Sequence, residues 1–186
     1  SIGNHRSHTG ESSLYVRTRN ISEDSPTDIW VSKVVSLMNR YEDDSQFRRS
    51  LSAADLYSKA SSQDLRYLFY FYNEHRADEK GERGGPSLTE AMSNEYTVEH
   101  IWPQSPDELP LEDADEYPSP EARYDAYVDR LGNLTLASRP WNSKWGNAPF
   151  ETKCDEGYVE SKLWVQWDIQ NDYHGWSVEN IEDREE

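Results

Sequence analysis

The sequence predicts an α+β domain in which helices flank a small pair of strands. Apolar residues recur at the i, i+3, i+4, i+7 spacing of a helix in the stretch that follows Ser62. Two short runs of strand-forming residues come later, from Tyr96 to Trp102 and from Leu134 to Ala137. The signals of a helix start follow the second run. The order of helices, strand, loop, strand and helix is typical of an α+β fold.

The N-terminal part is expected to be a flexible lead over residues 1–24, followed by a helical subdomain over residues 25–80. The lead is polar and irregular in composition. A first helix is predicted from Ser25 to Tyr41, because Ser25 can cap it and Pro26 suits the first helical position.

Two further helices are predicted in this subdomain. A short one covers residues 52–60, and a longer one follows Ser62. The apolar stripe of the longer helix consists of Leu65, Leu68, Phe69 and Tyr72. The aromatic residues between 65 and 75 would also suit a strand, but the acidic start and the length favour a helix. A glycine-rich loop over residues 77–87 is predicted to end the subdomain.

Length and cysteine content limit the class of protein. A chain of 186 residues suits one domain, or one domain with a helical annex. It begins at Ser1, which suggests a processed chain or a piece of a longer one, and no signal-peptide pattern opens it. Cys154 is the only cysteine, which excludes an intrachain disulfide and a CxxC zinc site. A reducing cytoplasm is therefore the expected location. No apolar run approaches the roughly 18 residues of a membrane span, so we expect no membrane contact.

The charge of the chain is strongly negative but unevenly distributed. The formal net charge is −17, which at first argues against binding to nucleic acid. Residues 104–129 carry nine acidic residues and one arginine, and residues 155–186 carry ten acidic residues against one lysine and one arginine. Residues 130–153 carry four basic residues and one acidic one. This basic island is where we expect contacts to phosphate.

Residues suited to phosphodiester hydrolysis lie in and after the two strands. The core is predicted over residues 81–186, with a finger over 96–154. Glu99 and the side-chain carbonyl of Asn142 are oxygen ligands of the kind that a hard divalent cation prefers. His100 has the imidazole that can take a proton from water near neutral pH.

The adjacency of Glu99 and His100 sets a geometric condition. Neighbouring residues of a strand point to opposite faces, so the two side chains can share one site only if the strand end is bent or bulged. Pro103 and a hydrogen-bonding amide could impose such a bend. Asn133 is well placed to bond the backbone of the loop that carries His100.

Three motifs in order resemble the HNH nuclease superfamily. They read "VEHIWPQS", "LGNLTLASRPWN" and "GNAPF". The spacing resembles the HNH domain of RNA-guided CRISPR nucleases, and the stronger likeness is to the HNH-like C-terminal domain of GmrSD-type modification-dependent restriction enzymes. That domain shares "LGNLTL", "N-S-K-x-x-N-x-P-F" and a terminal motif that reads "WSVENIEDR" in this chain. The resemblance implies a ββα-metal finger flanked by N-terminal and C-terminal helices.

The resemblance also implies a role for each matching position. His100 stands at the general base, and Asn142 stands at a metal-ligand position. Glu99 stands at the acidic ligand position, where the CRISPR domains have aspartate. Asn133 matches the middle catalytic residue, which shapes the loop and does not touch the metal. The implied cofactor is one divalent cation, Mg²⁺ or Mn²⁺.

Three further residues are candidates for contact with nucleic acid. Arg139, Lys144 and Asn147 lie in or beside the basic island and close to Asn142 in the sequence. Their charge and proximity predict contacts to DNA phosphates.

The expected function is therefore a metal-dependent DNA endonuclease with little sequence preference, the effector of a restriction or anti-phage defence protein. The likeness to GmrSD enzymes implies an upstream ParB-like nucleotide-hydrolysing domain in the full-length chain. Cleavage of both strands by a single-site finger would need two copies, so a homo-oligomer is among the expected states.

Two alternatives stay open at the level of sequence. The charge of −17 also suits an acidic protein-interaction or DNA-mimic module with a degenerate finger. RNA is a second candidate substrate, because the motifs address phosphate and not the sugar.

Overall fold

The computed structural model describes residues 44–82, 85–109 and 116–186. The predicted lead over 1–24 and the helix predicted from Ser25 to Tyr41 lie outside the described residues. The chain divides into two compact units, 1–51 and 52–186. The first unit contains the described helix α3 (Asp44–Leu51). All other helices and strands named below belong to the second unit.

A two-stranded antiparallel sheet lies at the centre of the second unit. Strand β1 (Tyr96–His100) pairs with β2 (Leu134–Ser138), with Tyr96 opposite Ser138 and His100 opposite Leu134. The pairs run one to one without a bulge. Both predicted strands are confirmed, whereas the bulge that would bring Glu99 and His100 to one face does not occur between these paired residues.

Side chains from surrounding helices satisfy the outer edges of both strands. A two-stranded sheet leaves its outward carbonyls without a strand partner, and buried carbonyls need hydrogen bonds. The donor and acceptor pairs are Arg66 to Tyr96 O (3.3 Å), Asn142 to Val98 O (3.0 Å), Lys153 to His100 O (2.6 Å), Gln166 to Leu136 O (2.9 Å) and Arg184 to Leu134 O (3.2 Å). These bonds fix a sheet that would be marginal by itself.

The helices before β1 confirm most of the sequence prediction. α4 (Leu56–Lys59) is short, and α5 (Ser62–Lys80) begins where Ser61 accepts a hydrogen bond from Asp64 N. α5 extends into the predicted loop because its sequence favours a helix up to Gly81, whose φ of 71° ends it. A further helix, α6 (Leu88–Met92), starts with a capping box.

The buried face of α5 is rotated from the predicted stripe. Leu65 and Phe69 are buried as expected, and the same face continues through Asn73 and Ala77. Tyr72 is exposed, which the sequence did not predict. The i, i+4 rows of a helix explain the difference, because Leu65, Phe69 and Asn73 lie along one row and Tyr72 lies beside it.

The segment between the strands contains more structure than predicted. The stretch between the two strands, which was expected to be a loop, includes α7 (Pro120–Asp125), which Ser119 caps and whose first turn contains proline. A 3₁₀ turn, η1 (Leu131–Asn133), leads directly into β2.

Helices also follow β2 to the end of the chain. α8 (Arg139–Trp145) and α9 (Phe150–Glu156) come first, and 3₁₀ turn η2 (Tyr158–Glu160), α10 (Trp164–Asp172) and α11 (Val178–Asp183) complete the unit. Asn142 lies within α8, whose first turn contains proline.

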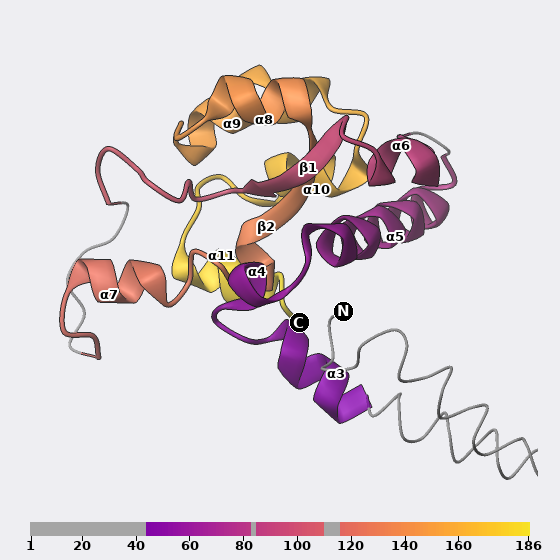
Figure 1. Ribbon diagram of the computed structural model, residues 1–186. Coiled ribbons are helices and arrows are strands. Elements are labelled where there is room, and N and C mark those ends of the chain that lie inside the picture. The colour runs from indigo at the N-terminus through magenta and orange to yellow at the C-terminus, as the bar shows by residue number, and fades with distance from the viewer. Residues whose placement is uncertain (1–43, 83–84, 110–115) are drawn as a thin grey trace, which may run out of the picture. The chain divides into compact units, whose positions relative to one another are not determined.

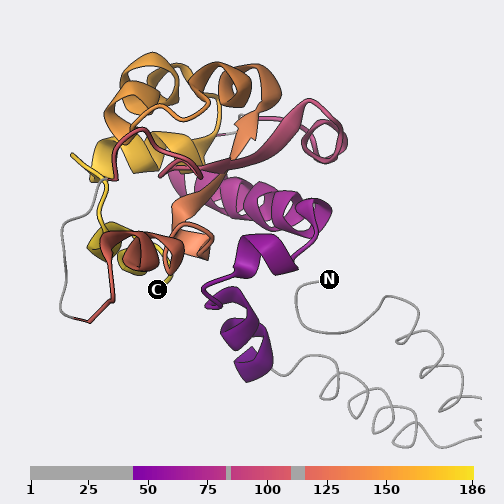
Figure 2. The same ribbon diagram turned by 60° about the vertical axis from the view of Figure 1, so that its left-hand side comes forward.

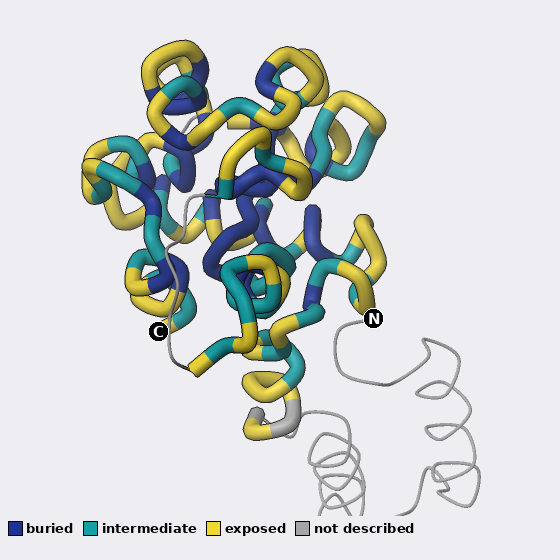
Figure 3. Tube along the Cα trace, turned by 90° about the vertical axis from the view of Figure 1, so that its left-hand side faces the viewer, coloured by how far each residue is buried: buried dark blue, intermediate teal, exposed yellow. Residues whose placement is uncertain are grey.

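The sheet lies between two groups of helices. Figure 1 and Figure 2 show α8 and α9 on one side of the strands, and α4 and α5 on the other. Buried residues concentrate in the strands and in the turns that face them, as Figure 3 shows, while the outer turns are exposed. Ile101 and Trp102, directly after β1, belong to the hydrophobic core. None of the described helices is long and apolar enough to cross a membrane.

Candidate active site

The end of β1 carries Glu99 and His100 in opposite directions. The two side chains have different partners: Glu99 pairs with Lys153 of α9, whereas the imidazole of His100 contacts Tyr57 of α4 and Asp129. The regular pairing with β2 keeps the alternation of the strand intact at both positions. The two side chains that the motif predicted for one site therefore lie on different faces of the sheet.

His100 forms a pair with Asp129. Its Nε2 lies 3.1 Å from Asp129 Oδ1, and its side chain is 7% exposed. The ring of Tyr57 meets the imidazole edge-on at 4.3 Å between centroids. The backbone N–H of Tyr57 also donates to Asp129 O at 3.1 Å, so the three residues hold one another in place.

The pair with Asp129 determines which imidazole nitrogen can act as a base. An ionised carboxylate only accepts hydrogen bonds. Nε2 must therefore carry a hydrogen and donate it in the hydrogen bond to Asp129. The lone pair of the neutral ring is then on Nδ1. Burial lowers the pKa of His100, an effect that Asp129 opposes and Lys153 reinforces. The ring is therefore neutral near pH 7, as a general base must be.

Glu99 forms a buried ion pair. Its Oε1 lies 2.6 Å from Lys153 Nζ, and the two side chains are 4% and 0% exposed. Burial raises the pKa of Glu99 and lowers that of Lys153, and the attraction between the two charges opposes both shifts. The same ammonium donates to His100 O at 2.6 Å and to Ile101 O at 3.2 Å.

Asn133 joins the end of β1 to the rest of the domain. Its Oδ1 accepts from Trp102 N at 2.8 Å and from Trp176 Nε1 at 3.0 Å. Its Nδ2 donates to Trp102 O at 3.1 Å and to Val128 O at 2.8 Å. The amide is fully buried, and it bonds the backbone just after His100, as the sequence indicated.

Asn142 lies beside β1, near the middle of the strand. Its Nδ2 donates to Val98 O at 3.0 Å, which orients the amide along the outer edge of β1. The residue is half-buried. Its observed contact is therefore with the strand backbone.

Glu99 and Asn142 differ in how well they suit the cation site that the motif implied. The Glu99 carboxylate is buried and already paired with an ammonium, whereas Asn142 uses only its Nδ2 to hold Val98 O. Within the described ranges, no group of three or more His, Cys, Asp or Glu side chains could hold a metal ion. Glu99, as arranged here, does not fit a divalent cation with open positions, whereas the bond of Asn142 to Val98 O does not engage its side-chain oxygen.

The three residues predicted to contact nucleic acid, in α8 and directly after it, have different neighbours. Arg139 Nε donates to Asn94 O at 2.6 Å at the start of β1. Lys144 pairs with Glu156 at 2.9 Å and lies over the ring of Trp141. Asn147 lines a separate pocket. Their contacts to DNA phosphates stay a prediction.

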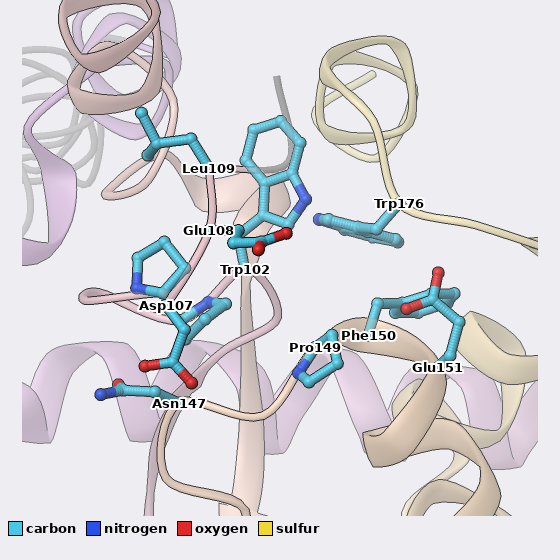
Figure 4. A pocket seen from close by; sticks show the side chains of 11 residues that line it. Trp102, Asp107, Glu108, Leu109, Asn147, Pro149, Phe150, Glu151 and Trp176 are labelled. Carbon is cyan, nitrogen blue, oxygen red and sulfur yellow. The ribbon is translucent and has the colours of Figure 1, made fainter. Parts of the chain in front are cut away.

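That pocket has a volume of about 440 Å³ and lies beside the segment that follows β1 (Figure 4). Trp102, Phe150 and Trp176 form part of its wall. Its charged side chains are all acidic, namely Asp107, Glu108 and Glu151. A pocket of this composition suits a cationic or aromatic group better than a phosphate.

Sequence reasoning missed Tyr57, Asp129 and Lys153. Asp129 is one of nine acidic residues between positions 104 and 129, so its type alone does not distinguish it. Lys153 is one of the four basic residues of the basic island. One signal was available: Asp129 lies four residues before Asn133, so whatever holds Asn133 next to β1 also brings Asp129 near its end. For Lys153, the sequence offered no comparable indication.

A neutral histidine with a carboxylate partner, on a segment that a buried asparagine holds, defines a domain with a candidate acid–base site. The chain belongs to the family of GmrSD restriction endonuclease C-terminal domains, whose model matches residues 41–186. This confirms the resemblance that the motifs predicted and places the chain in a family of nuclease domains. No curated protein matches the chain.

Proposed function

We propose that this domain hydrolyses phosphodiester bonds of DNA, with His100 as the general base. The pairing of His100 with Asp129 supports this proposal more than any other observation, because it supplies a neutral imidazole of defined tautomer. Family membership supports the reaction class and DNA as the substrate. The HNH type of the finger belongs to the proposal and is supported by the three motifs.

In the proposed reaction, Nδ1 of His100 takes a proton from a water molecule. The water oxygen forms a bond to phosphorus, and the bond from phosphorus to the 3′ oxygen breaks. Asp129 orients the imidazole and stabilises its charge after the proton arrives. Asn133 holds the backbone beyond His100 so that the ring keeps its direction.

Dependence on Mg²⁺ or Mn²⁺ is part of the proposal and rests on the resemblance. Glu99 does not fit such an ion as it is arranged, while the resemblance implies the side-chain oxygen of Asn142 as a ligand, and the reaction steps above use neither residue. The same resemblance supports an upstream ParB-like domain as the source of target choice in restriction or phage defence. Low sequence preference and a homo-oligomer that cuts both strands complete the proposal.

Plasmid nicking in the presence of Mg²⁺ or Mn²⁺ tests the role of His100. We expect His100→Ala to reduce the rate by at least about 100-fold, because general-base catalysis typically contributes that much. His75→Ala is the matched control, since His75 is exposed on α5 and lies 3.6 Å from Glu79. Equal nicking by the wild type and His100→Ala would end the assignment to this site.

The acidic pocket favours a second candidate, a module that binds a basic protein. Three carboxylates and no basic side chain line it. Binding of a lysine-rich peptide that Glu108→Gln and Glu151→Gln weaken, without any DNA cleavage by the wild type, would favour this candidate over the nuclease.

A further inference from the structure

The ammonium of Lys153 is surrounded by oxygen atoms. Glu99 Oε1 and His100 O lie 2.6 Å from Nζ, and Ile101 O lies 3.2 Å from it. The two carbonyls accept hydrogen bonds from the ammonium, and the Glu99 carboxylate is its ion-pair partner. The side chain is fully buried, and its charge is compensated within the protein.

The carboxylate of Glu99 is also enclosed by the protein. Glu99 is 3% exposed, and Thr135 lies directly opposite it on β2. Burial raises the pKa of the Tyr158 phenol, and the charge of Glu99 adds to this shift. Among the described residues, Glu99 Oε1 and the hydroxyls of Thr135 and Tyr158 have no hydrogen-bond partner, so the charge of Lys153 is what compensates the carboxylate.

Divalent cations in hydrolytic sites keep open positions for water and phosphate oxygens. The surroundings of Glu99 offer the reverse, because a buried ammonium already neutralises the carboxylate. Placing a divalent cation on Glu99 would require Lys153 to leave a fully buried position and two carbonyls to lose their donor.

We propose that Lys153 is a built-in cation of this domain, a positioning residue that holds the main chain of His100 and Ile101, and that Glu99 is its counter-ion and not a metal ligand. The backbone at the end of β1 is then fixed from two sides. Lys153 holds the carbonyls of His100 and Ile101, and Asn133 O accepts from Ile101 N at 2.8 Å.

This double hold keeps His100 directed at Asp129 on the opposite face. The importance of that direction for catalysis rests on the proposed nuclease function, whereas the pairing of Lys153 with Glu99 does not. Three variants of the full chain separate the two: Glu99→Gln, Lys153→Met and the double variant.

Thermal unfolding tests the pairing. Removing one partner of a buried ion pair leaves an uncompensated charge, while removing both does not. We expect each single variant to unfold at a clearly lower midpoint, and the double variant to regain at least half of the larger loss. Additive losses in the double variant would overturn the pairing.

Addition of Mn²⁺ tests whether Glu99 is a ligand. We expect Mn²⁺ to shift the unfolding midpoint of the wild type and of the double variant by the same amount. A shift of zero in both proteins also meets this expectation. An increase in the wild type that disappears in the double variant would show that Glu99 holds the ion, and would overturn the proposal.

Amide hydrogen exchange tests the positioning role without any use of activity. In the double variant, we expect Ile101 and Trp102 to exchange at least ten-fold faster, while Val165, whose N–H bonds Asn73, stays unchanged. Exchange rates of Ile101 and Trp102 equal to those of the wild type would overturn the positioning role.

Kinetics gives a second test if the wild type nicks DNA. The kcat of the double variant should then fall ten-fold or more, with KM within two-fold of the wild type. A kcat equal to that of the wild type would contradict the positioning role. If the wild type does not nick DNA, the proposed function fails, but exchange and unfolding still decide this inference.

Discussion

Asn133 and Trp102 are joined by two reciprocal hydrogen bonds. The side-chain oxygen of Asn133 accepts from Trp102 N at 2.8 Å, and its nitrogen donates to Trp102 O at 3.1 Å. An amide side chain can satisfy a backbone N–H and C=O at once, as a neighbouring strand would. The Asn133 side chain therefore pairs with the backbone of Trp102 as a strand residue would. It does so just beyond the end of β1, where the candidate site begins.

The first prediction concerns this amide. Asn133→Asp replaces a donor by an acceptor against the carbonyls of Trp102 and Val128 and buries a charge. We expect a loss of about 3 kcal/mol or more in the free energy of unfolding. Denaturant unfolding measures it, with Asn147→Asp as the control, since Asn147 is exposed. A loss equal to that of the control would show that the amide does not hold this segment.

The second prediction concerns Asp129. Asp129→Asn keeps the shape of the side chain but removes the charge that stabilises the protonated imidazole. We expect the nicking rate to fall by about 10- to 100-fold, with little change in the unfolding midpoint. Asp125→Asn is the matched control, because Asp125 is exposed at the end of α7. A rate within two-fold of the wild type would remove Asp129 from the proposed reaction.

The third prediction concerns Gly132, which lies against α11. A Cβ added to Gly132 would come within 1.9 Å of Ile181 O, which is a backbone atom and cannot rotate away. We expect Gly132→Ala to cost about 2–3 kcal/mol of stability. Gly175→Ala is the control, because an added Cβ there meets nothing within 4 Å. Equal unfolding midpoints for the two variants would contradict the close packing of α11 on η1.

The fourth prediction concerns Cys154, which is buried in α9. Burial raises the pKa of its thiol to about 12. We expect slow alkylation by iodoacetamide at pH 8 in the native protein and fast alkylation in denaturant, because the thiolate is the reactive form. A native rate equal to the denatured rate would contradict the burial.

The raised pKa of Cys154 also has a consequence for stability. The folded state keeps the thiol proton to higher pH than the unfolded state, whose pKa is near 9.0. The stabilisation of the folded state that this pKa difference provides is fully present below pH 9. It declines as the pH rises towards 12. Cys154→Ser, which has no such titration, should reduce the slope of stability against pH in this range.

The sequence by itself determined the local parts of this protein. The residues between 62 and 80 form a helix because their propensities and apolar spacing agree, and both strands follow from short runs of strand formers. The motifs determined the family, because each depends on residue types at fixed spacing. The role of Asn133 next to β1 was also predictable, since the motif places it directly before β2.

Only the tertiary structure decided the partners of Glu99 and His100. Strand alternation states that the two side chains diverge, but it does not state what covers each face. Asp129 lies 29 residues from His100, and the Nζ of Lys153 reaches a carbonyl 53 residues away. Contacts over such separations depend on how α4, α8 and α9 pack on the sheet, which no local pattern contains. For this reason the ligand predicted from the motif, Glu99, is found paired with a lysine.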